Sequence, residues 1–129
     1  MVCSPNRVVV DLSALSANLD QARRLVGLET KIMGVVKSDA YGHGLIPVSR
    51  VLVEKEVFCL GVAHVEEGLD LRRNGIRCPV FVLSGIRTRE EAGAVIRENL
   101  TPVLYDLETA ALLADECRRD RKKVNVQLK

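Results

Sequence analysis

The chain of 129 residues is predicted to have an α/β fold with parallel strands. Short apolar runs of strand length recur about every 20 to 25 residues, and segments with helical periodicity separate them. Because each connection holds a helix, consecutive strands should pair in parallel through right-handed crossovers. Two architectures suit this order: an open doubly wound sheet, or a (β/α)8 barrel of which only a part is present. The pattern alone does not choose between them.

The first half of the chain is expected to alternate helix and strand from its start. Leucines at helical spacing from Leu12 to Val26 make one apolar face, and Gly27 is suited to end that helix. A second helical stretch should open at Pro47, and a third should end before Gly75. The apolar runs that indicate strands over the whole chain are 31–37, 57–62, 80–83, 100–105 and 124–128.

Two later helices carry sequence signals for their first residues. Thr88 followed by Glu91 is a capping box, which opens a helix that runs through Ile96. Asp106 is suited to cap a helix over residues 107–118, whose apolar residues form one stripe. Together with the strands, these helices complete the predicted order.

The composition excludes several classes of function. Hydrophobic residues make up 47% of the chain, which is ample for a core, and the net charge is only +2 with no basic stripe. Few basic charges are available in excess to neutralise phosphates, and only 3% of the residues are aromatic and could stack on bases. No nucleic-acid partner is therefore expected. No apolar stretch approaches the roughly 20 residues that span a bilayer, and residues 1–5 lack the apolar core of a signal peptide.

The cysteines are predicted to be buried thiols rather than metal ligands or disulfide partners. Cys3, Cys59, Cys78 and Cys117 are widely spaced and form no C-x-x-C pair, so no metal site is expected. Chains with unpaired thiols belong in a reducing compartment, and the cytoplasm is the predicted location.

Lys37 is the first candidate for a functional residue. It ends an apolar run, and an ammonium group is costly to remove from water. If Lys37 emerges at the C-terminal end of a strand beside a desolvated pocket, its pKa should fall toward neutrality. A neutral amine there can form a Schiff base with an aldehyde. The alternative reading is an ordinary lysine whose head group reaches solvent.

The residues after Lys37 favour the functional reading. Tyr41 lies four positions on, and Gly42 and Gly44 let the backbone approach a ligand closely. The N–H groups at the start of the following helix could receive an anion such as phosphate. An amine, a phenol and a phosphate-sized cradle this close together indicate a phosphorylated aldehyde cofactor.

Residues 35–44 read Val-Val-Lys-Ser-Asp-Ala-Tyr-Gly-His-Gly. This stretch strongly resembles the pyridoxal-phosphate attachment segment of alanine racemases, in which Ala usually stands at position 38 and Asn or Asp at position 39. Residues 10–19 look like the first helix of that family, and the segments 61–68 and 79–85 look like its second strand with its helix and its third strand. The resemblance therefore covers essentially the whole chain.

The resemblance implies a partial (β/α)8 TIM-type barrel with about five of its eight strands present. Residues 1–129 would be the N-terminal part of the barrel domain, and the rest of the barrel and a C-terminal β domain would be absent. The chain stops at Lys129 within an expected strand, so we expect a piece of a longer protein. Open sheet edges should make the piece self-associate, and a homodimer is expected for the full-length protein.

The resemblance also implies roles for four residues and a cofactor, pyridoxal 5′-phosphate. Lys37 would hold the cofactor as a Schiff base and later act as one of two acid/base groups at the substrate Cα. Tyr41 resembles the tyrosine that hydrogen-bonds the cofactor phosphate. Val35 and Leu83 match positions that line the pocket, although plain core packing explains them nearly as well.

Three other polar residues are weighed against the same family. His43 is expected to shape the loop rather than to act as the catalytic base, and His64 to cap a helix or face solvent. Lys129 falls where some members carry a carbamylated lysine. As the terminal residue here, it is not expected to serve that way.

The function implied is racemisation of L- and D-alanine, which supplies D-alanine for peptidoglycan. Racemisation needs a proton donor on each face of the planar intermediate, and in the family the second is a tyrosine of the partner subunit's C-terminal domain. We therefore expect this chain to be inactive alone. Three alternatives stay open: a non-catalytic pyridoxal-phosphate-binding barrel protein, a racemase or decarboxylase of another amino acid on the same fold, and a half-barrel with a purely structural identity.

Overall fold

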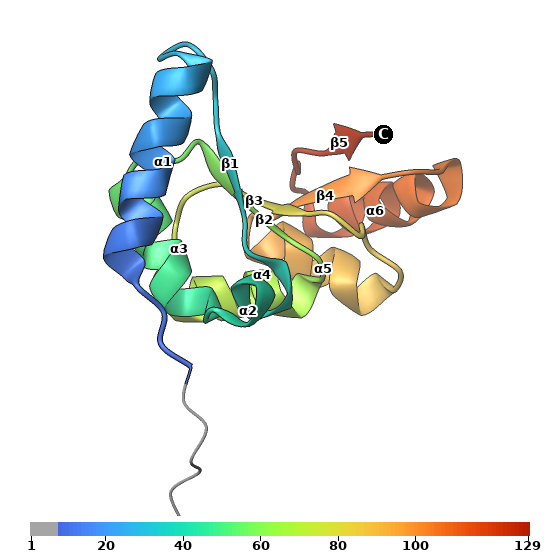
Figure 1. Cartoon of the computed structure of the whole chain (residues 1–129). Helices are drawn as coiled ribbons and strands as arrows, with labels where there is room; N and C mark the ends of the chain where they lie inside the picture. The colour runs from blue at the N-terminus through green and yellow to red at the C-terminus, as the bar shows by residue number, and fades with distance from the viewer. Residues whose placement is uncertain (1–7) are drawn as a thin grey trace, which may run out of the picture.

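The computed structural model describes residues 8–129, arranged as five strands and six helices (Figure 1). The strands are β1 (Met33–Val35), β2 (Cys59–Val62), β3 (Val80–Val82), β4 (Thr101–Leu104) and β5 (Gln127–Leu128). The helices are α1 (Leu12–Val26), α2 (Lys37–Gly42), α3 (Leu45–Glu54), α4 (Val65–Arg73), α5 (Arg89–Arg97) and α6 (Leu107–Asp120). Every strand lies within a predicted apolar run but is shorter than it. Residues 1–5, in which no signal peptide is expected, lie outside the described part.

The sheet decides between the two architectures that the sequence left open. Its five strands are parallel and run in the order β1-β2-β3-β4-β5, and neighbouring helices contact one another along the sheet, α3 with α4, α4 with α5 and α5 with α6. A doubly wound sheet reverses its strand order at a switch point, whereas a barrel adds each strand beside the last. This sheet never reverses, so the fold is the predicted partial (β/α)8 barrel.

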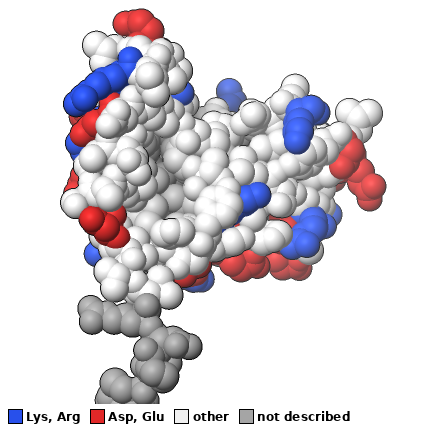
Figure 2. Space-filling view, viewed as in Figure 1, with Lys and Arg blue, Asp and Glu red and all other residues white. Residues whose placement is uncertain are grey.

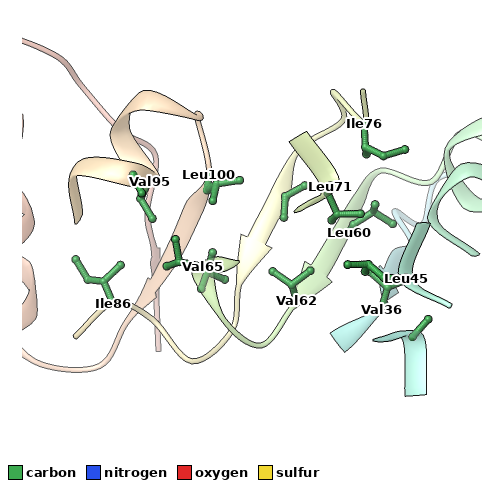
Figure 3. Packing of buried hydrophobic residues seen from close by; sticks show 14 of the residues in the cluster. Val36, Leu45, Leu60, Val62, Val65, Leu71, Ile76, Ile86, Val95 and Leu100 are labelled. Atoms are coloured by element: carbon green, nitrogen blue, oxygen red, sulfur yellow. The ribbon is translucent and has the colours of Figure 1, made fainter. Parts of the chain in front are cut away.

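The two faces of the sheet differ in burial. The side chains that point toward the helices are wholly buried: Val36, Leu60, Val62, Val80 and Val82 are each 0% exposed. Figure 3 shows part of this cluster, in which residues of β2 and its flanking helices pack together. The opposite, inner face is partly open, since Val35 at its edge is 38% exposed. A closed barrel buries its inner face as well, so this face is the one that remains to be covered.

The predicted helix ends are largely confirmed. Gly27 follows α1 with φ of +83°, a conformation that favours glycine, and the side chain of Asp106 accepts the N–H of Thr109 at 2.7 Å at the start of α6. The side chain of Thr88 accepts the N–H of Glu91, but the Glu91 carboxylate turns back to the N–H of Arg87 rather than to Thr88.

The prediction that Pro47 opens a helix was wrong by two residues. α3 begins at Leu45, and Pro47 lies in its first turn. Proline is tolerated there because the first N–H groups of a helix have no partner within the helix.

The three cysteines in the described residues are free thiols, as predicted. Cys59 is buried, while Cys78 and Cys117 are partly buried. Burial raises the pKa of all three thiols, so each stays protonated and unreactive near neutral pH. Cys3 lies outside the described residues. None of the helices within residues 8–129 is long and apolar enough to cross a membrane.

Ser49 is a polar residue whose burial should lower stability. It lies on α3 with 0% exposure, and its hydroxyl has no hydrogen-bond partner in the described chain. Because a buried unpaired hydroxyl is costly, we expect Ser49→Ala to raise the free energy of unfolding by about 1 kcal/mol, measured by urea denaturation. Ser16→Ala on α1 is the control, since it gains the same helix propensity without removing a fully buried hydroxyl. A lower urea midpoint for Ser49→Ala than for the wild type would contradict this.

Candidate active site

Lys37 lies where the sequence placed it, at the C-terminal end of a strand. It follows β1 by two residues, and Leu83 follows β3 by one. Parallel strands bring such positions to one edge of the sheet, which is where barrels carry their reactive groups. Lys37 is half-buried, and its Nζ makes no hydrogen bond or ion pair to any other residue in the range 8–129. The amine is therefore free to meet a ligand.

The segment after Lys37 is a left-handed helical turn, not the glycine-rich loop that the sequence indicated. Ser38, Asp39, Ala40 and Tyr41 all have positive φ, between 52° and 56°, and none is glycine. L-residues pay roughly 1 to 2 kcal/mol each for this conformation, so surrounding contacts must hold the turn in place.

Hydrogen bonds to Asp39 connect the left-handed turn to the start of α3. The Asp39 carboxylate accepts the N–H of Leu45 at 2.6 Å, and the Asp39 carbonyl accepts the N–H of Gly44 at 2.9 Å. The sequence suggested that the start of this helix could receive a phosphate. The first N–H of α3, that of Leu45, instead donates to Asp39, and Pro47 has no N–H. The start of α3 therefore offers a phosphate few free N–H donors.

His43 shapes the same turn. Its Nδ1 lies 3.0 Å from the carbonyl oxygen of Ala40 and 3.1 Å from that of Tyr41. A carbonyl only accepts, so Nδ1 carries the proton in these contacts. This agrees with a loop-shaping role. His64 is the N-cap residue of α4, but its side chain makes no cap hydrogen bond and the residue is exposed, which agrees with the solvent-facing role considered for it.

Val35 and Leu83 both neighbour Gly61 on the inner face of the sheet. Val35 pairs with Gly61 across the β1–β2 ladder, and a methyl group added at Gly61 would lie 3.3 Å from Leu83 Cδ1. The absent side chain at Gly61 therefore leaves space for Leu83 and for Met33, whose Sδ would lie 3.0 Å from that methyl group. Tyr105, which sequence reasoning did not single out, donates its hydroxyl hydrogen to the Leu83 carbonyl, and Lys129 Nζ lies 5.7 Å from the Tyr105 ring centre.

Tyr41 faces a different space from Leu83. Its side chain is 59% exposed and borders a cleft of about 760 Å³ between α1 and the free edge of β1. Val35 and His43 also line this cleft, but Lys37 and Leu83 do not. Figure 2 shows the surface beside α1 hollowed and largely uncharged, with most charged side chains toward the rim of the view. Val35 and Met33 are thus shared by the cleft and the inner face.

Glu67 is a contact that the sequence analysis missed. Its carboxylate accepts the N–H of Ser38 at 2.6 Å, although the two residues are 29 positions apart. The nearest sequence signal is the position of Glu67, third in its helix, which is typical of a capping box. The residue at the N-cap is His64 rather than Ser or Thr, so that signal is weak.

Comparison with known proteins fits this arrangement. Residues 10–129 match the family model described as alanine racemase, N-terminal domain. The chain belongs to this family. It is 40% identical over 125 residues to alanine racemase 2 of Caldanaerobacter subterraneus subsp. tengcongensis, covering 97% of this chain and 32% of that protein. It is 42% identical over 122 residues to the alanine racemase of Syntrophobacter fumaroxidans, covering 95% of this chain and 32% of that protein.

Solved structures of the family have the same fold. Alanine racemase from Clostridium difficile 630 superposes with a TM-score of 0.85 at 36% identity, covering 89% of this chain and 30% of that one. The same enzyme in complex with cycloserine gives a TM-score of 0.87 at 34% identity, covering 95% of this chain and 34% of that one. The chain thus spans about a third of the length of the racemases it matches.

Proposed function

We propose that this chain forms the first part of a pyridoxal-phosphate-dependent alanine racemase and that Lys37 is its catalytic lysine. The observation that carries the proposal is the free amine of Lys37 at the C-terminal end of β1, followed by a held left-handed turn, in a chain that belongs to the alanine racemase family. The cofactor's ring withdraws electrons and so stabilises negative charge at the substrate Cα.

The residues present fit such a cofactor in three respects. Lys37 Nζ is uncommitted and can condense with an aldehyde, releasing one water. The Tyr41 hydroxyl makes no hydrogen bond within the described chain, so it can meet a phosphate oxygen, although its side chain borders the cleft beside α1 that Lys37 does not line. Val35 and Leu83 are apolar side chains at or next to strand ends on the inner face, where Lys37 also lies, and would give the cofactor an apolar wall there.

Lys37 would have two tasks. Its Nζ would hold the cofactor, and the same amine, when free, would remove or return the Cα proton of the substrate on one face. The other face needs a second donor, so we propose that the chain alone does not racemise alanine at a useful rate. Interconversion of D- and L-alanine by the purified chain would contradict this.

Residues 1–129 are proposed to be the N-terminal part of the barrel domain, joined in the full-length protein to the remaining strands and a C-terminal domain. The free edge of β1, beside the cleft, and the free edge of β5 are the natural places for further strands. In the isolated chain the same edges should drive self-association, and the full-length racemase is proposed to be a cytoplasmic homodimer that supplies D-alanine for peptidoglycan.

The test is to mix the purified chain with pyridoxal phosphate, follow the visible absorbance, reduce with borohydride and map the pyridoxyl mass by peptide analysis. Label confined to Lys37 is the expected result, because a positioned amine reacts before randomly exposed ones. Label scattered over Lys31, Lys55, Lys122 and Lys123, or no label, would contradict the assignment of Lys37 for this chain.

A further inference from the structure

Glu67 joins two segments that are far apart in the sequence. It is the third residue of α4, and its Oε2 accepts the N–H groups of Ala63 at 2.7 Å and His64 at 3.1 Å. These contacts lie within its own βα connection and would serve to cap the helix. Its Oε1 accepts the N–H of Ser38 at 2.6 Å, and Ser38 lies in the preceding connection, shortly after β1. Capping α4 requires only the first pair, so the contact to Ser38 needs a separate explanation.

Ser38 is the first residue of the left-handed turn and directly follows Lys37. The four residues of the turn are held in a conformation that is unfavourable for each of them. Asp39 attaches the turn to α3, and Ala40, also part of the turn, is buried. Glu67 fixes the near end, and it does so from the neighbouring strand's unit. Without it, the peptide that joins Lys37 to Ser38 loses the partner of its N–H.

We propose that Glu67 is a positioning residue for Lys37. By holding the Lys37–Ser38 peptide, its carboxylate sets the direction in which the Lys37 side chain leaves the backbone. The inference rests on the proposed function, in which that amine reacts. A charged acceptor suits this task, because a hydrogen bond to a carboxylate is about twice as strong as one between neutral groups.

The test compares Glu67→Gln with Glu66→Gln. Both variants remove one negative charge from the first turn of α4, so their effects on the helix dipole are matched. Glu66 is exposed and makes no contact with Ser38. Glutamine at 67 keeps the size of the side chain, but its amide nitrogen cannot accept, so at least one of the three backbone N–H groups loses its partner.

Two quantities are measured on variants that circular dichroism shows to be folded. The first is the hydrogen exchange rate of the Ser38 amide by NMR, which needs no cofactor. The second is the label ratio, defined as chains that carry pyridoxal-phosphate label at Lys37 to unlabelled chains after a fixed time of reaction. We expect Glu67→Gln to speed Ser38 exchange and to lower the label ratio, each at least about tenfold, and Glu66→Gln to match the wild type.

The outcomes separate the two claims. A folded Glu67→Gln variant with faster Ser38 exchange and a wild-type label ratio would overturn the positioning role. Wild-type Ser38 exchange in both Glu67→Gln and Glu67→Asp would overturn the claim that Glu67 holds the turn. A wild type that carries no label at Lys37 would overturn the proposed function, while the Ser38 exchange would still decide whether Glu67 holds the turn. If Glu67→Gln does not fold, Glu67→Asp takes its place. The shorter side chain keeps the charge but cannot span both segments, so the same two losses are expected.

Discussion

Replacing Arg72 by alanine is expected to lower the free energy of unfolding by about 3 to 5 kcal/mol. Arg72 is 7% exposed and has no carboxylate partner in the described residues. Its guanidinium donates instead to four backbone carbonyls, those of Ile76 at 2.9 Å, Cys78 at 3.0 Å, Glu98 at 2.9 Å and Asn99 at 3.0 Å.

These carbonyls belong to the α4–β3 and α5–β4 connections, so one side chain holds two neighbouring loops at the N-terminal end of the sheet. Alanine would leave a cavity and several partly buried carbonyls without donors. Burial lowers the pKa of Arg72, but a guanidinium starts so high that it stays charged at neutral pH. The loss is a large share of the roughly 5 to 15 kcal/mol that stabilises a typical domain.

Urea denaturation followed by circular dichroism measures this effect. The matched control is Arg73→Ala, because Arg73 is the next residue on the same helix and has an exposed ion pair with Asp70 only. Exposed pairs contribute little, so the free energy of unfolding of Arg73→Ala should stay within about 0.5 kcal/mol of the wild type. Equal midpoints for the two variants would show that the carbonyl contacts of Arg72 carry no stability.

Lys37→Arg is expected to abolish covalent attachment of pyridoxal phosphate at position 37. A guanidinium is always protonated in proteins and is not a nucleophile, so no imine forms there. The free energy of unfolding should not change, because Lys37 Nζ has no partner among residues 8–129 that the substitution could remove. The effect on reactivity is thus complete while the effect on stability is near zero.

Peptide mapping after borohydride reduction and urea denaturation of the same sample check both halves of this expectation. Lys55→Arg is the control, since Lys55 pairs with Asp20 at 2.6 Å and should carry no label in the wild type. Label at Lys37 should persist in that variant. An unchanged visible band in Lys37→Arg would mean that another amine binds the cofactor.

The elements of this fold were predictable where their signals are local. Gly27 after the first helix, Thr88 and Asp106 before later ones, and apolar runs between them each act within a few residues. The strands came out shorter than their runs, because the ladder pairs only a few positions of each. The position of Lys37 at a strand end followed from the same kind of local pattern.

The geometry of the site was less predictable, because it depends on contacts between units. Ser38, Asp39, Ala40 and Tyr41 form a left-handed turn against the usual preference of such residues for negative φ. None of the four is a glycine, which would have indicated positive φ in the sequence. The contact of Glu67 with Ser38 joins the ends of two strands that only the folded sheet brings together. The same holds for Tyr105 and Leu83. The strained turn and the contacts that hold it depend on the assembled sheet, so a short stretch of sequence cannot predict them.

The uninterrupted strand order has a consequence for synthesis. Each strand pairs with the one made just before it, and α3, α4, α5 and α6 each pack on the helix before them, so neighbouring elements leave the ribosome close together in time. Parallel pairing across a helical connection is slower than forming a hairpin or a helix, but each pairing here needs only strands that are consecutive in the chain, and domains form from the N-terminus as they are made. The helix-covered layer, with Lys37 and its supported turn, can therefore be in place while later parts of a longer chain are still being translated.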